Sequence, residues 1–461
     1  MKVQFRMLLL LVVMSLVLSA CAPATAPAAP AAEQAAAQPA ADTAATSGEK
    51  IQVRFWYGLG GELGEVIETQ IKKFNESQDE IEVVGVFQQS YNGVQEKFQA
   101  ALVSGDVPEL VQIEIHGTPK FASAGALTPL EPFMENDPEF NFDDLIPAGL
   151  LNQSWNDTIY AMPINRSTPV LYYNKAMFEE AGVEPPTTWQ GVVEAARAIK
   201  ARNAAPIPMT TAWPTWVHFE QYGAMHNLPF ATKGNGFDGL DTELRINAPA
   251  YAKHLQRLLD MGKEGLFRWG GRDNAAEPLF VSGEAAIQFT SSAGRAAIAR
   301  DAKFNWAMAL LPTDPEVNPN PINSVIGGAS IWTMTAPNRT LAEYRAVANF
   351  FAYISQPAVD AEWHQRTGYV PVTSAAYEVS KGQGFYQKTP GTDLPILQLS
   401  RGQLSENSRG FRLGRMVELR NIIQEEMERA LQGQQTAQAA LDSAVQRGNR
   451  VLREFERTAR G

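Results

Sequence analysis

The chain has 461 residues, of which 45% are hydrophobic, and a formal net charge of −11 at pH 7. A surface this acidic repels nucleic acid and anionic lipid, so an anionic ligand would have to be captured by a local pocket rather than by a general field. Cys21 is the single cysteine, which excludes an internal disulfide and a thiolate metal site, so the folded part depends on its apolar core for stability.

The N-terminus has the pattern of a secretory signal. Residues 1–20 begin with a short basic segment, continue with an apolar run that ends at Leu18, and finish with the small pair Ser19-Ala20. The apolar run is too short to span a bilayer comfortably, which disfavours the alternative of a transmembrane helix. The sequence therefore predicts a signal peptide that is absent from the working protein.

The residues that follow predict a lipid anchor and a linker. The string Leu18-Ser19-Ala20-Cys21 resembles a bacterial lipobox, which implies cleavage before Cys21 and lipidation of its thiol. Residues 21–48 consist largely of Ala, Pro, Thr and Gln and contain no aromatic residue. Such a segment cannot bury enough apolar surface to offset its ordering entropy, and its prolines keep it extended. We expect a semi-rigid linker between the lipid and the folded part.

Strand and helix patterns alternate in the first part of the folded region. Alternating apolar residues predict strands over 51–55, 81–87 and 109–115, and apolar residues at helical spacing predict helices over 62–75 and 94–103. That alternation predicts a mostly parallel sheet covered by helices. Loops rich in Pro and Asn follow over about 130–160.

A second series of elements begins at Thr168. Strands are expected over 169–173, 284–290, 304–311 and 327–335. Helices are expected over 175–181, 189–199, 248–264, 275–283, 340–355, 357–367 and 416–460, the last broken near Gly433. The two series predict two α/β lobes with the chain passing between them.

Several motifs of catalysis are missing from the sequence. The five histidines form no HExxH pair, and no P-loop, GxSxG or strand-linked GxGxxG is present. We therefore expect a binding protein, with no cofactor and no metal. An exported carbohydrate hydrolase stays open as an alternative, because many carboxylate pairs can be proposed as an acid–base dyad.

Four strings, in this order along the chain, resemble one family of binding proteins. They are Tyr172-Tyr173-Asn174-Lys175, Gly327-Gly328-Ala329-Ser330-Ile331-Trp332, Trp363-His364-Gln365-Arg366-Thr367-Gly368-Tyr369 and Arg412-Leu413-Gly414. The first resembles the wider sugar-binding class that includes maltose-binding protein, and the others resemble its sn-glycerol-3-phosphate-binding branch. The similarity runs from about residue 50 to the C-terminus. The chain is identified as a member of the family 1 extracellular solute-binding proteins of ABC importers.

That resemblance implies a two-lobed, periplasmic-binding-protein-like α/β fold with a hinge between the lobes. One lobe would comprise 49–160 plus 310–372, and the other 161–309 plus 373–461. Closure of the lobes around a ligand is a known mode of switching. The resemblance also implies a permease and an ATPase as partners. We expect a monomer tethered to the outer face of the cytoplasmic membrane, or located in the periplasm.

The same resemblance places ligand contacts at particular positions. They are Tyr91, Ser167, Ser291, Gly328, Tyr369 and Arg420, with an aromatic wall at Trp213 and Trp216. These residue types suit an organic phosphate. Its oxygens accept hydrogen bonds from a guanidinium and from hydroxyl groups, and a glycine lets a backbone N–H come close because it has no Cβ. Each residue also has a structural alternative, since tryptophans usually lie in cores and an arginine can be a solvated helix charge.

One position departs from the family pattern. The family has a ligand-binding carboxylate at the position of Ile115, whereas this chain has Glu114 before it and His116 after it. A slip of one residue turns a strand side chain to the opposite face. Either Glu114 supplies the carboxylate through a local bulge, or the contact is lost and His116 or a different ligand replaces it. The sequence thus predicts a receptor for sn-glycerol 3-phosphate or a glycerophosphodiester, with a sugar as the alternative ligand.

Overall fold

The computed structural model describes residues 50–115, 121–122, 124–130, 154–155 and 158–459. The predicted signal peptide, Cys21, the linker and His116 lie outside these residues. Within the described ranges, no helix combines the length and the apolar character that crossing a bilayer requires.

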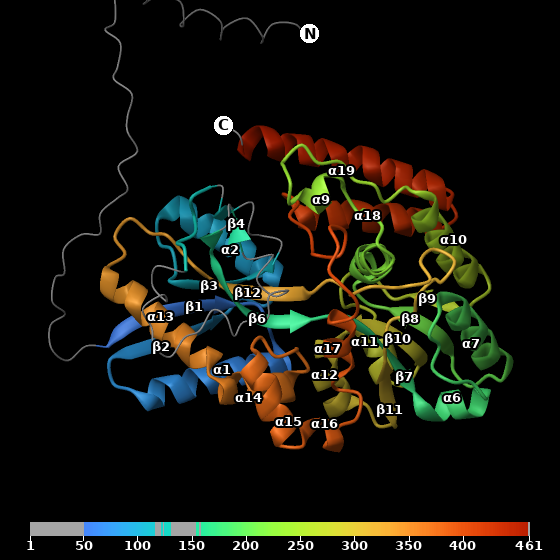
Figure 1. The fold of residues 1–461 in the computed structure, drawn as a ribbon, viewed down its shortest axis with the longest axis horizontal. Coiled ribbons are helices and arrows are strands. Elements are labelled where there is room, and N and C mark those ends of the chain that lie inside the picture. The colour runs from blue at the N-terminus through green and yellow to red at the C-terminus, as the bar shows by residue number, and fades with distance from the viewer. Residues whose placement is uncertain (1–49, 116–120, 123, 131–153, 156–157, 460–461) are drawn as a thin grey trace, which may run out of the picture. The chain divides into compact units, whose positions relative to one another are not determined.

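The first sheet has the strand order β2-β1-β3-β12-β6 (Figure 1). Its strands are β1 (Ile51–Tyr57), β2 (Ile81–Phe87), β3 (Leu110–Glu114), β6 (Ala161–Ser167) and β12 (Gly327–Thr333). Strand β1 runs parallel to β2 and β3, whereas β12 is antiparallel to both β3 and β6. The small hairpin of β4 (Ser154–Trp155) and β5 (Thr158–Ile159) is separate from this sheet.

Helices cover both faces of the first sheet, as the alternation of its side chains requires. They are α1 (Gly61–Ser77), α2 (Tyr91–Ser104), α13 (Leu341–Ser355) and α14 (Pro357–Thr367). Val53 and Phe55 of β1 share a core with Val66 of α1 and Phe350 of α13. On the other face, Val111 of β3 joins a separate core with residues of α2.

The second sheet has the order β11-β7-β10-β8-β9. Its strands are β7 (Pro169–Asn174), β8 (Ile207–Thr211), β9 (Phe267–Trp269), β10 (Ala285–Ser291) and β11 (Trp306–Ala309). Strand β8 is parallel to β9 and β10, while β7 is antiparallel to β10 and β11. The mostly parallel sheet expected from the first series is confirmed, since β1, β2 and β3 run in one direction and only β12 enters that sheet from the opposite direction. In the second sheet, β7 likewise runs against its neighbours.

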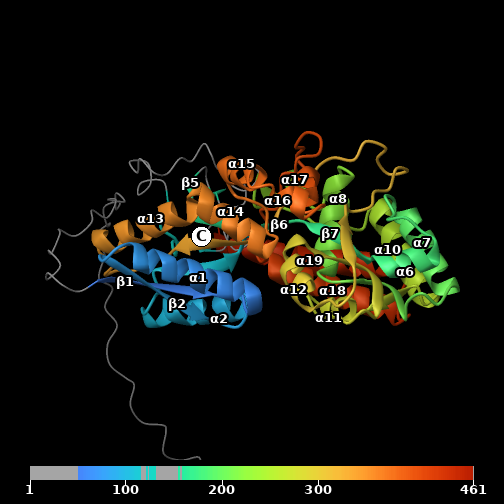
Figure 2. The same cartoon turned by 90° about the horizontal axis from the view of Figure 1, so that it is seen from below.

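Most helices of the second half pack around this second sheet (Figure 2). They are α6 (Lys175–Ala181), α7 (Trp189–Ala201), α8 (Tyr222–Met225), α9 (Thr232–Gly236), α10 (Pro249–Lys263), α11 (Glu277–Val281), α12 (Arg295–Asp301), α18 (Met416–Leu431) and α19 (Ala437–Ala459), with a π-helix at Trp216–Gln221. Three further helices are α15 (Ser374–Gly382), α16 (Phe385–Lys388) and α17 (Leu394–Leu399). The break expected near Gly433 is confirmed, since that glycine lies between α18 and α19 with φ of +75°.

The chain passes from the first sheet to the second at Thr168. Strand β6 still pairs with β12 through Ser167, so the first sheet extends beyond residue 160, where the lobe boundary was expected. The Thr168 hydroxyl lies 2.8 Å from that of Ser324, and Gln398 Nε2 donates to it at 2.8 Å. These three buried side chains join segments far apart in sequence at the crossing, which fixes where the two sheets are connected.

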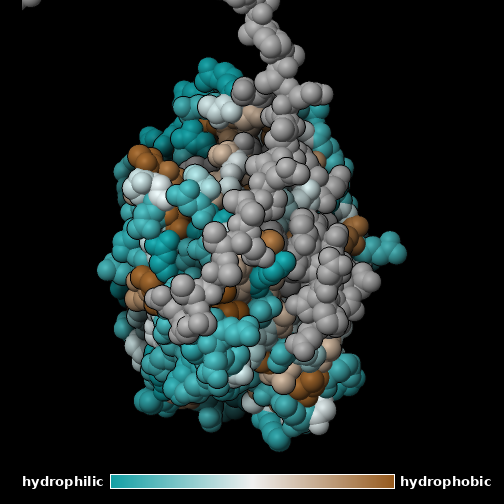
Figure 3. Space-filling model, turned by 90° about the vertical axis from the view of Figure 1, so that its left-hand side faces the viewer, coloured by the Kyte–Doolittle hydropathy of each residue, from teal (hydrophilic) through white to brown (hydrophobic). Residues whose placement is uncertain are grey.

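The surface agrees with the acidic, polar composition. Hydrophilic residues cover most of the coloured area in Figure 3, and apolar residues there form small, separate groups. Phe87 and Val103 are among the few large hydrophobic side chains that are exposed. Scattered apolar residues of this kind are normal on a protein surface.

Candidate functional site

Arg420 connects elements that belong to the two different sheets. Its Nε and Nη2 donate to the two carboxylate oxygens of Glu220, at 2.8 and 2.7 Å, and its Nη1 donates to Glu114 at 2.9 Å. Glu114 ends β3 of the first sheet, whereas Glu220 lies in the π-helix and Arg420 in α18. The Glu220 side chain is fully buried, and the other two are 16–17% exposed. This cluster is the centre of the candidate site.

The two carboxylates keep Arg420 charged in spite of its burial. Burial alone acts to lower the pKa of Arg420, but the negative charges of Glu220 and Glu114 outweigh it and hold the pKa above its usual value. A guanidinium has five N–H donors in a fixed planar arrangement. The three bonds to the carboxylates use three of them, so two N–H groups are left over from the contacts with the residues that the structure describes.

The neighbouring residues Glu114 and Ile115 have different surroundings at the end of β3. Glu114 is opposite Ala329 in the β3–β12 register, and its carboxylate reaches Arg420. Ile115 is buried in an apolar cluster with Ile326 and Val370, on the other side. A carboxylate one residue earlier in the chain thus lies in the candidate site. That Glu114 contacts a ligand stays a prediction.

Two predicted tyrosines meet at one asparagine that the sequence analysis did not identify. Asn165 Nδ2 donates to the Tyr91 hydroxyl at 3.3 Å, and Tyr369 also hydrogen-bonds both Tyr91 and Asn165. Burial raises the pKa of Tyr91 and of Tyr369, so both hydroxyls remain protonated donors. Tyr369 stacks parallel to Trp363, with ring centroids 5.6 Å apart, which fixes its orientation.

Gly327 and Gly328 begin β12 and pair with the end of β6, the strand that carries Asn165 and Ser167. Ser167 of β6 is buried opposite Gly327. Gly328 has φ of +113°, and a Cβ there would lie 1.6 Å from the Asn165 carbonyl oxygen. The strand can therefore approach Asn165 this closely only because position 328 is a glycine. Close packing within the sheet thus accounts for a glycine at 328, and the expected ligand contact of Gly328 stays a prediction.

The predicted aromatic wall lies on the second-sheet side. Trp216 begins the π-helix and packs against Gly327 of β12. Trp213 has φ of +51°, an uncommon value for a bulky residue, and its backbone N–H donates to the Asp273 carbonyl at 2.5 Å. The Trp213 side chain also bonds the carboxylate of Glu277. Polar partners thus hold Trp213 in this unusual conformation.

Ser291 ends β10 and has a clear structural task. Its hydroxyl accepts a hydrogen bond from the Ala293 N–H at 3.2 Å and caps a short 3-10 turn. In the strand register it is opposite Pro169, next to the crossing at Thr168. Its O–H proton is still available as a donor, because the cap uses the oxygen only as an acceptor.

The structure therefore joins some of the predicted residues by direct contacts: Glu114 with Arg420, and Tyr91 with Tyr369. Among the described contacts, Trp213 and Ser291 have other partners. The residues that sequence reasoning missed are Asn165 and Glu220. Glu220 carries a signal that could have revealed it: a carboxylate that follows the apolar residues Trp216, Val217 and Phe219 must be paired if the segment is buried. No signal in the sequence marks Asn165.

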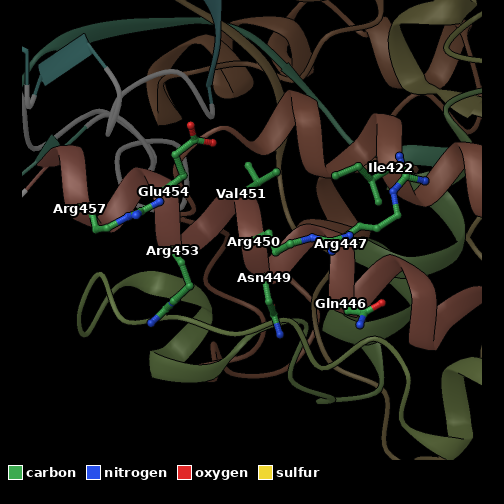
Figure 4. A pocket seen from close by; sticks show the side chains of 9 residues that line it. All are labelled: Ile422, Gln446, Arg447, Asn449, Arg450, Val451, Arg453, Glu454 and Arg457. Atoms are coloured by element: carbon green, nitrogen blue, oxygen red, sulfur yellow. The ribbon is translucent and has the colours of Figure 1, made fainter.

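A cavity of about 820 Å³ lies elsewhere, as an open groove between α18 and α19. Its lining includes Ile422, Arg447 and Glu454 but none of the predicted ligand contacts (Figure 4). Arg447 is already bonded to the carboxylates of Glu425 and Glu426. The groove is thus distinct from the candidate site. Among the residues with described positions, no cluster of His, Cys, Asp and Glu could hold a metal ion.

A protein-family model and known sequences match most of the chain. The model described as "Bacterial extracellular solute-binding protein" matches residues 69–392. The sn-glycerol-3-phosphate-binding periplasmic protein UgpB of Yersinia pseudotuberculosis is 37% identical over 411 residues, which cover 88% of this chain and 93% of the relative. The protein of the same name from Rhizobium meliloti is 40% identical over 408 residues, covering 87% and 94%.

Solved structures share the fold at lower identity. UgpB from Mycobacterium tuberculosis in complex with glycerophosphocholine matches with a TM-score of 0.73 and 21% identity, covering 88% of this chain and 99% of that one. The cyclic α-maltosyl-1,6-maltose binding protein from Arthrobacter globiformis matches with a TM-score of 0.70 and 20% identity, covering 88% and 100%. These likenesses confirm the predicted two-lobed α/β fold.

Proposed function

Because the chain belongs to the family of bacterial extracellular solute-binding proteins, we propose that it captures sn-glycerol 3-phosphate or a glycerophosphodiester for an ABC importer. It would deliver the ligand unchanged to the permease and ATPase. The observation that carries this proposal is the buried guanidinium of Arg420, which lies between Glu114 and Glu220 and uses three of its five N–H groups on them.

Each part of a glycerophosphate has a matching group in the site. The phosphate oxygens can accept from Arg420 and from the hydroxyls of Ser167 or Ser291. The glycerol hydroxyls can donate to Glu114 and bond Tyr91. The indole of Trp216 offers an apolar face to the glycerol carbons. The relatives that share 37% and 40% identity are named for the same ligand class, which supports this assignment.

Binding is proposed to close the two lobes around the ligand. Arg420 and Glu114 belong to elements of different lobes, so a ligand that binds both stabilises the closed arrangement. Movement is expected around the crossing at Thr168. Solution scattering should show a smaller radius of gyration with saturating ligand, and an unchanged radius would contradict closure.

The location and assembly belong to this proposal as well. A lipid on Cys21 and an extended linker over 21–48 would keep the receptor at the outer face of the cytoplasmic membrane, near its permease. We propose that it acts as a monomer. Mass spectrometry of the membrane fraction would detect the lipid on Cys21, and a soluble, unmodified chain would contradict the anchor.

Titration calorimetry tests the ligand class directly. We expect glycerol 3-phosphate or glycerophosphocholine to bind, and maltose not to bind. Arg420→Lys keeps the charge but loses the planar fork, and should weaken phosphate ligands about 30-fold or more. Arg272→Lys is a matched control, because Arg272 also forms a two-bond pair, with Glu428 of α18. Binding of maltose alone would overturn the proposal in favour of a sugar receptor.

A further inference from the structure

We propose that the groove between α18 and α19 is a docking site for an acidic amphipathic helix of a partner protein. The groove has a volume of about 820 Å³, and Ile422 of α18 and residues of α19 between 446 and 457 line it (Figure 4). Ile422 is two positions after Arg420, so their side chains leave α18 about 200° apart. The inference therefore concerns a surface away from the candidate site and does not depend on the ligand captured there.

The charge of the lining is opposite to that of the chain as a whole. The chain has a formal net charge of −11, yet four guanidinium groups line the groove: Arg447, Arg450, Arg453 and Arg457. Because successive members are three or four residues apart, they share one face of α19. Glu454 is the one carboxylate among the described residues of the lining, and Arg415 Nη1 donates to it at 2.5 Å. The groove is thus a local exception to the acidic surface.

Two of these arginines are available for a partner. Arg450 and Arg457 are exposed, and neither forms an ion pair or a hydrogen bond with any residue that the structure describes. The other two already form ion pairs, with the carboxylates of Glu425, Glu426 and Glu456. Arg457 lies in the last turn of α19, where a cation stabilises a helix, but Arg450 lies about two turns earlier, beyond that effect.

The lining also contains apolar surface. Ile422 and Val451 are half-buried, and both pack against the core of the second half of the chain. A small inorganic anion bound to the arginines would leave these two side chains in contact with water. A partner with apolar side chains would cover them, which adds to the binding free energy in proportion to the area covered.

The spacing of the free arginines matches a helix. Arg450 and Arg457 are seven residues apart, which corresponds to about 10.5 Å along the axis of α19. A second helix lying along the groove presents its residues i and i+7 at the same separation, with i+3 and i+4 on the same face between them. Carboxylates at i and i+7 would pair with the two arginines, and apolar residues between them would cover Val451 and Ile422. A membrane surface is flat and does not enter a groove in this way.

Fluorescence anisotropy of a labelled peptide tests the docking site. The probe is a capped helical peptide of about 18 residues, with glutamates at i and i+7 and leucines at i+3 and i+4. We expect the wild type to bind it, and the double variant Arg450→Glu, Arg457→Glu to bind it at least about tenfold more weakly. The double variant Arg202→Glu, Arg345→Glu is the matched control. It makes the same change in charge at two exposed arginines, at the end of α7 and in α13, that do not line the groove. An equal loss in both double variants would overturn the inference.

A second measurement uses the wild type alone. One peptide has serines in place of the two leucines, and another has the same composition as the probe with its glutamates on opposite faces. Each should bind at least about fivefold more weakly than the probe. The first loses the contact with Ile422 and Val451, and the second cannot reach Arg450 and Arg457 together. Equal affinities for the three peptides would show unspecific attraction between charges and would contradict a built site.

Two further probes test other occupants of the groove. Tighter binding of inorganic pyrophosphate than of the peptide, lost in Arg450→Glu, Arg457→Glu, would make the groove a site for small anions. Binding to phosphatidylglycerol vesicles that this variant abolishes, without binding of the peptide, would make it a membrane contact. Either result would overturn the helical partner, as would the absence of peptide binding up to about 1 mM. Ligand capture at Arg420 is measured separately, so neither proposal fails with the other.

Discussion

The indole of Trp216 lies against the backbone of Gly327, so closely that a Cβ at position 327 would fall 2.3 Å from ring atom Cζ2. The tryptophan comes from the π-helix beside the second sheet and the glycine from β12 of the first. The aromatic wall therefore has its position only because β12 presents a bare backbone at this point.

Gly327→Ala should displace this ring and weaken ligand binding. An indole is rigid and cannot bend away from the added methyl group, so the whole side chain must move. We expect an affinity loss of about tenfold or more for glycerophosphate ligands, measured by titration calorimetry. Gly382→Ala in α15 is the matched control, since an added Cβ there meets no atom within 4 Å. Equal affinities for the two variants would mean that Trp216 does not contact ligand.

Gly328→Ala should destabilise the fold rather than only the site. The residue combines φ of +113° with a Cβ position 1.6 Å from the Asn165 carbonyl oxygen. We expect a loss of at least about 3 kcal/mol in the free energy of unfolding, measured with urea. Gly105→Ala separates the two causes, because Gly105 has φ of +81° but open space around it, and should cost about 1 kcal/mol. A similar cost at both positions would contradict the steric argument.

Arg420 and Glu220 should behave as one unit in stability measurements. Arg420→Ala leaves the buried Glu220 carboxylate without its two-bond partner and should cost about 3–5 kcal/mol. The double variant Arg420→Ala, Glu220→Ala removes both charges and should cost less than the sum of the single variants by more than about 1 kcal/mol. Urea unfolding of the four proteins gives this coupling energy, and additive losses would show that the pair is not coupled.

The free energy of unfolding should decrease as the pH is lowered, because of a buried histidine pair. Arg257 Nη1 lies 2.9 Å from His254 Nδ1, and His254 Nε2 lies 3.2 Å from His218 Nδ1. An arginine can only donate, so neutral His254 carries its proton on Nε2 and donates it to His218. A proton added to Nδ1 of either ring would break a hydrogen bond. Burial lowers the pKa of His218 to about 3 and lowers the pKa of His254 as well.

Because the pKa values of His218 and His254 are lowered in the folded protein, stability decreases toward acid. The unfolded chain, with histidine pKa values of about 6.5, binds more protons than the folded one below that pH. The full stability is therefore present above about pH 6.5 and is lost toward acid, by about 1.4 kcal/mol per pH unit and histidine. Urea unfolding between pH 7 and 5 measures the slope, and His218→Gln should reduce it by about one proton. An unchanged slope would exclude His218 as its source.

Elements with a regular apolar pattern could be predicted from the sequence, and those that bury polar residues could not. Strand β2, Ile81–Phe87, has the expected bounds because its alternation is undisturbed. Strand β6 was missed, because Pro163, Asn165 and Arg166 interrupt its pattern even though all seven of its residues are buried. Arg166 is satisfied there by the Ala329 carbonyl and the Ser330 hydroxyl, which are far away in the sequence.

In the candidate site, too, some residues could be predicted from the sequence and others could not. Position-by-position similarity located Arg420 and the tyrosines, but not the register that turns Glu114 toward Arg420 and Ile115 toward Ile326. Glu220 escaped notice because its partner is contributed by a helix near the other end of the chain. Pairings of this kind depend on tertiary contacts, which a single sequence does not display.

The π-helix at Trp216–Gln221 carries both an aromatic residue of the candidate site and the carboxylate that pairs with Arg420. Its first residue supplies the aromatic wall, and Glu220 in the same turn supplies the counter-charge of the anchor. Insertion or deletion of one residue between them would rotate one side chain relative to the other by roughly a quarter of a turn. The spacing of this single turn thus constrains how the receptor can diversify: substitutions can retune the wall or the charge one at a time, but a change in length alters both together.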